Sequence, residues 1–223
     1  MSINSHLRLF RKKRKSYHKG EIELLFVRFL CSRNGVSIDI GANKGNYSLE
    51  LSKHSKKVIC IEPNQAFNSY LEKMPSNCEV QNFAITNKKE NIYLHAPLSK
   101  GRLKYNTAFI STEENIQDLQ LISKVEAKAL DDFINEKVAM VKIDVEGGEM
   151  DVLNSGRNLI NAQRPNFLIE SLTKDELRNQ IEFFKAYDYV ALKIIRDDIF
   201  FVSSDEIYDN CREVDRNTIF IPA

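Results

Sequence analysis

The chain has few cysteines, and their spacing excludes two common roles. Its 223 residues include Cys31, Cys60, Cys78 and Cys211. No two of them form a Cys-x-x-Cys pair, so the pattern indicates neither a zinc site nor a disulfide framework. Cys60 lies within a predicted hydrophobic strand, where a small apolar thiol is ordinary. This cysteine content fits a reducing, cytoplasmic environment best.

The sequence also lacks a hydrophobic run long enough to cross a membrane. Its most apolar N-terminal stretch, residues 24–30, is short and is interrupted by Arg28. A membrane-spanning helix needs about 20 apolar residues. The stretch does not resemble the apolar core of a signal peptide followed by a cleavage site either. We therefore expect a soluble protein.

The formal net charge of +1 conceals an asymmetry along the chain. Residues 1–19 contain seven Lys and Arg and no acid, whereas the remainder carries 25 Lys and Arg against 31 Asp and Glu, a net charge of −6. The run from Arg11 to Lys15 is either a solvated, flexible tail or a weak contact for an anionic membrane surface or nucleic acid, where each cation adds about 1 kcal/mol. We favour the tail and expect no specific nucleic-acid binding.

Residues 20–223 read as one α/β domain, because helical and strand patterns alternate and 43% of the chain is hydrophobic. An amphipathic helix is predicted within residues 20–33. Further helices are expected at 45–54, 64–74, 149–154, 156–161 and 174–186, the last opened by a capping box of Thr173 and Glu176. Strands are expected at 36–40, 57–61, 79–83, 138–143, 166–170, 188–195, 199–202 and 217–221.

The alternating pattern breaks at about residues 87–131, which predicts a long insertion before the fourth sheet strand. Within it, residues 91–95, 107–111 and 124–128 are short extended pieces. Residues 98–107 carry several hydrogen-bond donors and an aromatic ring. This segment suits contact with a polar acceptor and an ordinary exposed loop equally well.

A strand, a glycine turn and a helix begin the domain. Val36, Ile38 and Ile40 form the strand, and Gly41 and Gly45 allow a ligand to approach the backbone. The next strand ends in an acid about 20 residues after the first glycine, the spacing at which a carboxylate meets ribose hydroxyls. This acid is Glu62. The third glycine of a pyrophosphate loop is missing, which favours a nucleoside cofactor over a dinucleotide.

A second strand runs into acids and glycines at Lys142-Ile-Asp-Val-Glu-Gly-Gly-Glu149. This segment, the loop Asp39–Gly45 and the strand end Ile61–Asn64 together resemble the FkbM family of S-adenosylmethionine-dependent methyltransferases. Residues 129–134, just before the second strand, are similar to a leucine-and-aspartate segment of that family. The order and spacing agree over roughly residues 35–172.

The resemblance implies a class I methyltransferase fold of the Rossmann-like α/β class. That fold has a mostly parallel sheet with helices on both faces and an antiparallel last strand. It also implies S-adenosylmethionine as cofactor and a hydroxyl of a glycan or other secondary metabolite as acceptor. Ligands of such sheets bind outside the carboxyl ends of the strands, so the acids there are expected to converge although they are far apart in sequence.

The cofactor residues follow from this geometry and the resemblance. We assign Asp39 to the amino-acid end of the cofactor and Glu62 to its ribose. Asn43 either orients the carboxylate end or caps the helix. The remaining cofactor candidates are the backbone of Gly41, Ala42 and Gly45, and, for adenine, Phe83 and Ala84, although an aromatic ring in a strand is more often core.

Methyl transfer to a weakly acidic hydroxyl requires a base or a metal, and the catalytic candidates are acids. Asp144 and Glu146 lie nearest the expected position of the methyl group, and Glu170 is a third candidate. Glu149 and Asp151 are better explained as acids at a helix N-terminus, which complement its dipole. Asp144, Glu146 and Glu149 are also oxygen ligands suited to Mg²⁺, but no pattern fixes an octahedral site and we expect none.

Other interpretations remain open. His95 is a further candidate base, because histidine commonly serves as one, but a lone histidine is more often structural. An NAD(P)-dependent oxidoreductase shares the strand, glycine turn and ribose acid, but it is disfavoured because the third glycine of a pyrophosphate loop is missing. A non-catalytic binding module is the third alternative. The oligomeric state and the acceptor are not encoded in any pattern we identify.

Overall fold

The computed structural model describes residues 22–88, 91–99, 101–133, 135–195, 198–204, 209 and 216–223. The predicted basic tail at residues 1–19 and Cys211 lie outside the described residues. Within the described ranges, no helix combines the length and apolar character needed to cross a membrane.

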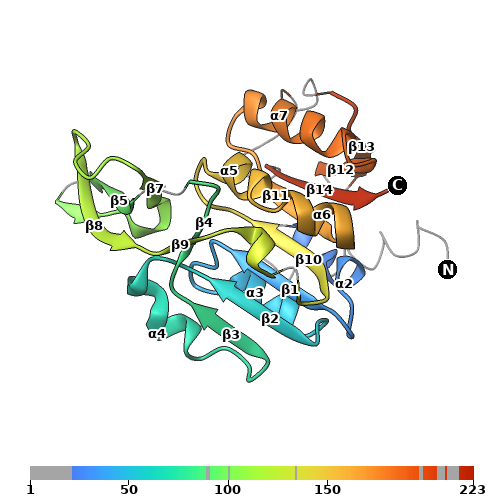
Figure 1. The fold of residues 1–223 in the computed structure, drawn as a ribbon, viewed down its shortest axis with the longest axis horizontal. Helices are drawn as coiled ribbons and strands as arrows, with labels where there is room; N and C mark the ends of the chain where they lie inside the picture. The colour runs from blue at the N-terminus through green and yellow to red at the C-terminus, as the bar shows by residue number, and fades with distance from the viewer. Residues whose placement is uncertain are drawn as a thin grey trace.

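Strands of the described residues form one main sheet of eight, in the order β13-β12-β14-β11-β10-β1-β2-β3 (Figure 1). Strands β1, β2, β3, β10 and β11 are mutually parallel, whereas β14 runs antiparallel to both of its neighbours. The bounds are β1 Val36–Ile40, β2 Lys57–Ile61, β3 Cys78–Gln81, β10 Val138–Ile143, β11 Asn166–Glu170, β12 Tyr189–Ile195, β13 Asp198–Phe201 and β14 Asn217–Pro222. The predicted mostly parallel sheet with an antiparallel last strand is confirmed.

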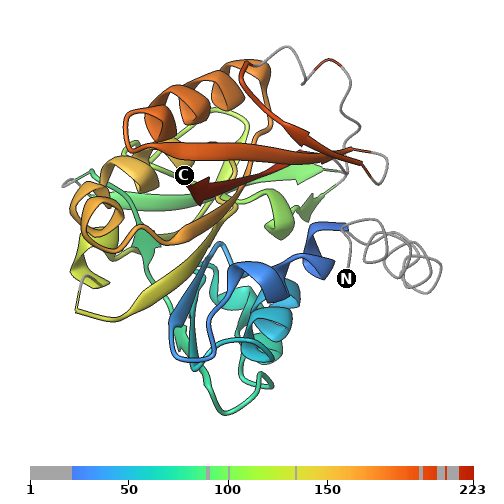
Figure 2. The same ribbon diagram turned by 90° about the vertical axis from the view of Figure 1, so that its right-hand side faces the viewer.

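Helices cover both faces of this sheet because its central strands are buried on both sides. Helices α2–α4 pack in one apolar cluster and α5–α7 in another, with alternate strand residues facing each. Figure 2 shows the N-terminal helices (blue) and the later ones (orange) on opposite sides of the sheet. The bounds are α2 Val27–Leu30, α3 Asn46–Ser52, α4 Asn68–Leu71, α5 Glu149–Asn154, α6 Arg157–Gln163 and α7 Lys174–Lys185.

Two predicted helices are shorter than expected. The helix predicted within 20–33 is a 3₁₀ turn, η1 (Ile22–Leu25), followed by the single turn of α2. The helix predicted at 64–74 starts as the 3₁₀ turn η2 (Gln65–Phe67), because the side chain of Asn64 accepts a hydrogen bond from Ala66 N and tightens the turn. By contrast, the predicted capping box at the start of α7 is confirmed.

The chain leaves the main sheet after β3 and returns to it at β10. A short parallel pair, β4 (Ala84–Ile85) with β9 (Ala127–Lys128), connects a small antiparallel sheet to the main domain, and Figure 1 shows this sheet (green) set apart from the large one. Its strands are β5 (Ile92–Ser99), β6 (Arg102–Leu103), β7 (Phe109–Ser111) and β8 (Leu119–Val125), with the 3₁₀ turn η3 (Tyr105–Thr107) between β6 and β7. The 3₁₀ turn η4 (Leu130–Phe133) then leads into β10.

One glycine brings the carboxyl ends of β1 and β10 into direct contact. Gly41 has φ +82°, and a Cβ atom placed on it would lie 1.8 Å from the carbonyl oxygen of Asp144. The backbone N–H of Asp144 donates to the carbonyl of Ile40 at 3.0 Å, and Gly41 N donates to Ile61 O at 2.9 Å. Because no side chain intervenes, the loops that follow β1, β2 and β10 meet at one point.

We predict that Gly41→Ala lowers the free energy of unfolding by more than 2 kcal/mol, because both the strained φ and a backbone collision oppose the new Cβ. Gly101→Ala is the matched control, since Gly101 has φ +71° and open space around its Cβ position. The control should lose only the cost of left-handed backbone, about 1 kcal/mol. Urea unfolding followed by circular dichroism measures both values, and equal losses would contradict the close contact.

Candidate cofactor and catalytic site

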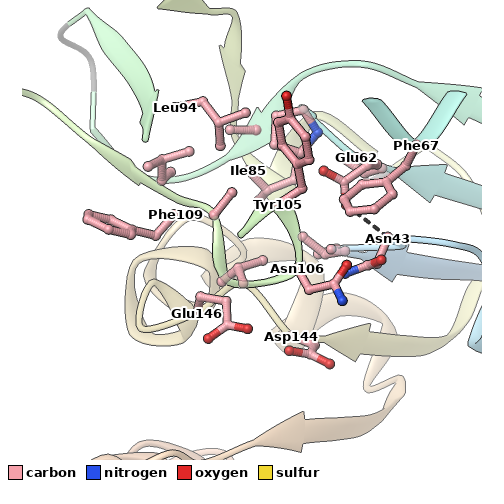
Figure 3. Close-up of a pocket in the computed structure, with 18 of the residues that line it drawn as sticks. Asn43, Glu62, Phe67, Ile85, Leu94, Tyr105, Asn106, Phe109, Asp144 and Glu146 are labelled. Carbon is pink, nitrogen blue, oxygen red and sulfur yellow. Dashed lines mark hydrogen bonds between the residues drawn. The ribbon is translucent and has the colours of Figure 1, made fainter. Parts of the chain in front are cut away.

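The acids predicted to converge do line one region at the carboxyl edge of the sheet. A cavity of about 240 Å³, which we call the central cavity, is lined by Gly41, Asn43, Glu62, Asp144 and Glu170, among other residues. Phe83, Ala84 and Glu146 also line it. Figure 3 shows the carboxyl groups of Glu62, Asp144 and Glu146 around this space. Four parallel strands therefore deliver their terminal residues to one cavity, as the topology requires.

A second cavity of about 350 Å³ adjoins the central cavity. We call it the Asp39 cavity; its lining includes Asp39, Ala42 and Lys142. Gly41, Asn43, Asn106 and Asp144 line both spaces, so the two are neighbours. Of the predicted cofactor residues only Gly45 lines neither cavity. It begins α3 with φ +82° and packs against Met74, so its role is to turn the chain.

Glu62 is held in place by backbone donors. Its two carboxylate oxygens accept hydrogen bonds from Asn43 N and Asn64 N, each at 2.8 Å, and the first is drawn in Figure 3. Burial raises the pKa of Glu62 to about 7, although these two hydrogen bonds favour its charged form. The side chain of Asn43 does not cap α3, whose N-cap residue is Gly45 without a side-chain hydrogen bond. Asn43 instead contributes its backbone to the position of Glu62.

Asp39 lies beneath the glycine loop. Its carboxylate is 1% exposed and accepts a hydrogen bond from the hydroxyl of Ser48 at 2.5 Å. Burial raises the pKa of Asp39 to about 6, partly offset by Ser48 and by the nearby charge of Lys142. Asp39 and Asp144 line the Asp39 cavity together with Lys44 and Lys142.

Lys142 is a functional candidate that the sequence interpretation missed. Its side chain is 1% exposed, and its ammonium group donates to Asp144 Oδ2 at 3.3 Å, Asn217 Oδ1 at 3.2 Å and Ile143 O at 3.2 Å. The same group lies 5.0 Å from the ring centroid of Tyr47. A lysine inside the hydrophobic strand Val138–Ile143 was the available signal, because lysine is almost never fully buried unless it is paired.

The three catalytic candidates differ in their ionisation. The positive charge of Lys142 and a hydrogen bond with Glu170 outweigh burial and hold the pKa of Asp144 below its usual range. Burial, with the charges of Asp144 and Glu149, raises the pKa of Glu146 to about 7. Burial and the charge of Asp144 raise the pKa of Glu170 to about 8. Near neutral pH, Asp144 is ionised, Glu170 is protonated and Glu146 is close to its midpoint.

Glu149 and Asp151 lie in the first turn of α5, as the sequence interpretation expected, and each also has a specific partner. Glu149 is 1% exposed, and its Oε1 accepts hydrogen bonds from Val145 N and Gly147 N, both at 3.2 Å. It therefore closes the loop that carries Glu146. Asp151 forms an ion pair with Lys88 at 2.8 Å. No group of three or more potential metal-ligating side chains is found among the residues that the structure describes.

The apolar wall of the central cavity comes from two sources. Phe83 is 4% exposed and belongs to the main core, yet it and Ala84 also face the cavity. The inserted segment supplies Tyr105, Asn106 and Phe109, which also line the cavity and are labelled in Figure 3. Residue patterns located this segment but did not distinguish a cavity wall from an exposed loop.

His95 is a structural residue. It is fully buried in the small sheet, its Nε2 lies 3.1 Å from the carbonyl oxygen of Glu114, and it is not among the residues that line the central cavity. Its ring packs 6.2 Å from that of Phe109.

The charged residues that line the central cavity are all acidic among the described residues. Glu62, Asp144, Glu146 and Glu170 line it, and no Lys or Arg of the described residues does. With Asp144 ionised and Glu62 and Glu146 close to their midpoints near neutral pH, such a space favours a positively charged ligand and disfavours the pyrophosphate of a dinucleotide.

The raised pKa of Glu170 makes the stability of the ligand-free protein depend on pH. The native state binds this proton more tightly than the unfolded chain, whose value is near 4.5. The contribution of Glu170 to the free energy of unfolding is therefore fully present below about pH 4.5 and is lost as the pH rises toward 8. At pH 8.5, Glu170→Gln should have a higher free energy of unfolding than the wild type. The difference between variant and wild type should be about 1 kcal/mol more favourable to the variant at pH 8.5 than at pH 5.5, after allowance for solvent screening.

Urea unfolding at the two pH values measures this difference. Glu113→Gln, at an exposed position of the small sheet region, is the control and should follow the wild type. A Glu170→Gln profile parallel to that of the wild type would show that the proton is not held in the native state.

Comparisons with known proteins agree with this geometry. Residues 39–191, more than half of the chain, match the profile of the methyltransferase FkbM domain. No curated protein sequence matches the chain.

Among solved structures, the methyltransferase FkbM from Methylobacillus flagellatus KT has a TM-score of 0.55 and 16% identity, covering 85% of this chain and 44% of that one. The chain thus spans less than half of the length of that protein. A putative rRNA methylase from Clostridium thermocellum has a TM-score of 0.54 and 8% identity, with coverages of 92% and 96%. A putative methyltransferase from Streptococcus mutans, in complex with SAH, has a TM-score of 0.50 and 12% identity, with coverages of 92% and 99%.

At these identities the solved structures establish the fold, and the profile match establishes the family. The profile match confirms the predicted FkbM methyltransferase family, and the solved structures confirm the predicted fold. The profile match shows that the chain belongs to the FkbM methyltransferase family, and the two glycine-and-acid loops and the sheet that brings them together agree with it.

Proposed function

We propose that this protein transfers a methyl group from S-adenosylmethionine to a hydroxyl group of a glycan or other secondary metabolite. One observation carries the proposal: the central cavity is lined by four acids and by no Lys or Arg of the described residues, at the point where β1, β2 and β10 end. S-adenosylmethionine has a sulfonium and an ammonium group against one carboxylate, so its net charge matches this space.

The residues present fit the cofactor. Glu62, fixed by two backbone donors, presents carboxylate oxygens that would accept hydrogen bonds from the ribose hydroxyls. Phe83 and Ala84 would contact the adenine ring. Asp39 and Asp144, which line the Asp39 cavity, would stabilise the cationic amino-acid end. The collision that a Cβ at Gly41 would suffer shows how closely the loop is packed there.

When bound, the cofactor supplies the methyl group that the acceptor oxygen takes. The protein must remove the hydroxyl proton and hold the acceptor in line, and a general base contributes typically 10²–10⁴-fold. We assign the base to Glu146. Its carboxyl group faces the cavity, its pKa is about 7, and no hydrogen bond joins it to another described residue.

Asp144 and Glu170 are weaker candidates for the base than Glu146. Asp144 is ionised but is engaged by Lys142, so it is a weaker base and a better partner for a cation. Glu170 keeps a proton near neutral pH. Glu146 also has φ +58°, a left-handed conformation uncommon for a residue with a side chain, and such strain is concentrated at functional sites.

Calorimetry with S-adenosylhomocysteine tests the cofactor assignment. We expect binding by the wild type, and a loss of about tenfold or more in Asp39→Ala and in Glu62→Ala, because each removes a charged partner of the ligand. Glu113→Ala is the control and should bind as the wild type does. Tight binding of NADH with no binding of S-adenosylhomocysteine would contradict the proposal.

The base assignment is tested with an acceptor found by screening sugars and glycosides for release of S-adenosylhomocysteine. Glu146→Gln should lower kcat by about 10²-fold or more and leave cofactor affinity unchanged. In the wild type, kcat/KM should fall as the pH drops below about 7, because Glu146 becomes protonated. An unchanged rate in Glu146→Gln would reject Glu146 as base, and the same test on Asp144→Asn would then examine the alternative.

A further inference from the structure

A third cavity opens beside the central cavity. It has a volume of about 480 Å³, and we call it the Tyr70 cavity. One wall comes from the segment after β2, with Phe67 and Tyr70, and the other from the inserted segment, residues 103–107. Lys44 of the glycine loop also lines it, as it does the Asp39 cavity.

The charge of the Tyr70 cavity is opposite to that of the central cavity. Lys44 and Lys104 line it, and no Asp or Glu of the described residues does. Neither lysine forms an ion pair with a described acid, although the Lys44 ammonium group lies 5.8 Å from the ring centroid of Tyr70. Two uncompensated cations in one concave space attract an anion.

Two aromatic rings are exposed in the same cavity. Tyr70 is 48% exposed and Tyr105 is 39% exposed, so both present ring surface to a ligand. A tyrosine contributes a large apolar contact area and a hydroxyl group that forms hydrogen bonds. A sugar ring has both an apolar C–H face and hydroxyl groups, and it therefore suits this wall.

The Tyr70 cavity shares lining residues with the central cavity. Phe67, Tyr105 and Asn106 line both, and Asn106 lines the Asp39 cavity as well. A ligand held in the Tyr70 cavity can thus extend past these residues toward the acids of the central cavity.

We propose that the Tyr70 cavity is an acceptor subsite that recognises a phosphorylated sugar, with the phosphate between Lys44 and Lys104 and the sugar ring against Tyr70 and Tyr105. The opposite charges of the two cavities then separate the ligands: the cationic cofactor enters the acidic space and the anionic acceptor the basic one. This inference rests on the proposed function, because it assigns the substrate of the same site.

The test is calorimetry of glucose 1-phosphate against protein saturated with S-adenosylhomocysteine, so that the cofactor space is filled. We expect binding that weakens as salt is raised. Binding should weaken about tenfold in the double variant Lys44→Gln/Lys104→Gln, which removes both cations. Tyr70→Leu should weaken it as well. Uncharged glucose should bind far less tightly than glucose 1-phosphate.

The matched control is Lys137→Gln/Lys185→Gln, which removes two exposed lysines outside the three cavities. It should leave the affinity for glucose 1-phosphate unchanged. Equal affinity for glucose and glucose 1-phosphate, equal weakening in both double variants, or no binding of glucose 1-phosphate would each overturn the subsite.

Failure of the subsite differs from failure of the proposed function. If S-adenosylhomocysteine binds and glucose 1-phosphate does not, only the subsite is rejected. If S-adenosylhomocysteine does not bind, the methyl-transfer proposal fails, and the acceptor role of the Tyr70 cavity fails with it. Lys104→Gln and Tyr70→Leu alone, at residues that line neither of the other cavities, should retain the affinity for S-adenosylhomocysteine.

Discussion

The site depends on the contact between the ends of β1 and β10, which is possible because residue 41 is glycine. The backbone of Gly41 lies against the carbonyl of Asp144 so closely that no side chain fits between them. Strand register then places Asp39 opposite Lys142, two residues before the contact. Two loops separated by about a hundred residues thus present their polar groups to the same space, and their order along the sheet determines which groups meet.

The second feature of the site is a set of ionisable groups held away from water. Lys142 is buried and donates hydrogen bonds to Asp144 and Asn217, and the pKa values of the carboxyl groups of Glu62, Glu146 and Glu170 are raised. Burying charge is unfavourable unless it is paired, so a cluster of this kind lowers the stability of the ligand-free protein. Such clusters are concentrated at functional sites. A cationic ligand would provide the missing positive charge, which links the electrostatics of the cavity to the cofactor that the family uses.

Much of the fold was predictable because its signals are local. Buried parallel strands are short β-branched runs, and the glycines and acids that follow them mark the functional edge. The positions of Asp39, Glu62 and Asp144 at that edge follow from topology alone. Their protonation does not, because it depends on Lys142 and Glu170, which approach only in the folded chain.

The inserted segment shows the opposite situation. Nothing in residues 98–107 indicates whether Tyr105 and Asn106 face a cavity or solvent, because their position depends on how the small sheet is attached through β4 and β9. Glu149 does lie in the first turn of α5, as expected, but the two hydrogen bonds that its carboxylate accepts from the preceding loop follow from no local pattern. Both features depend on contacts between segments rather than on local pattern.

The central claim is that the acid-lined cavity at the ends of β1, β2 and β10 holds the nucleoside cofactor. A crystal structure of the protein in complex with S-adenosylhomocysteine tests it most directly. The account predicts adenosine in the central cavity, with the ribose hydroxyls hydrogen-bonded to Glu62, the adenine ring against Phe83 and Ala84, and the amino-acid end toward Asp39. Ligand density elsewhere, or a ribose without contact to Glu62, would contradict it.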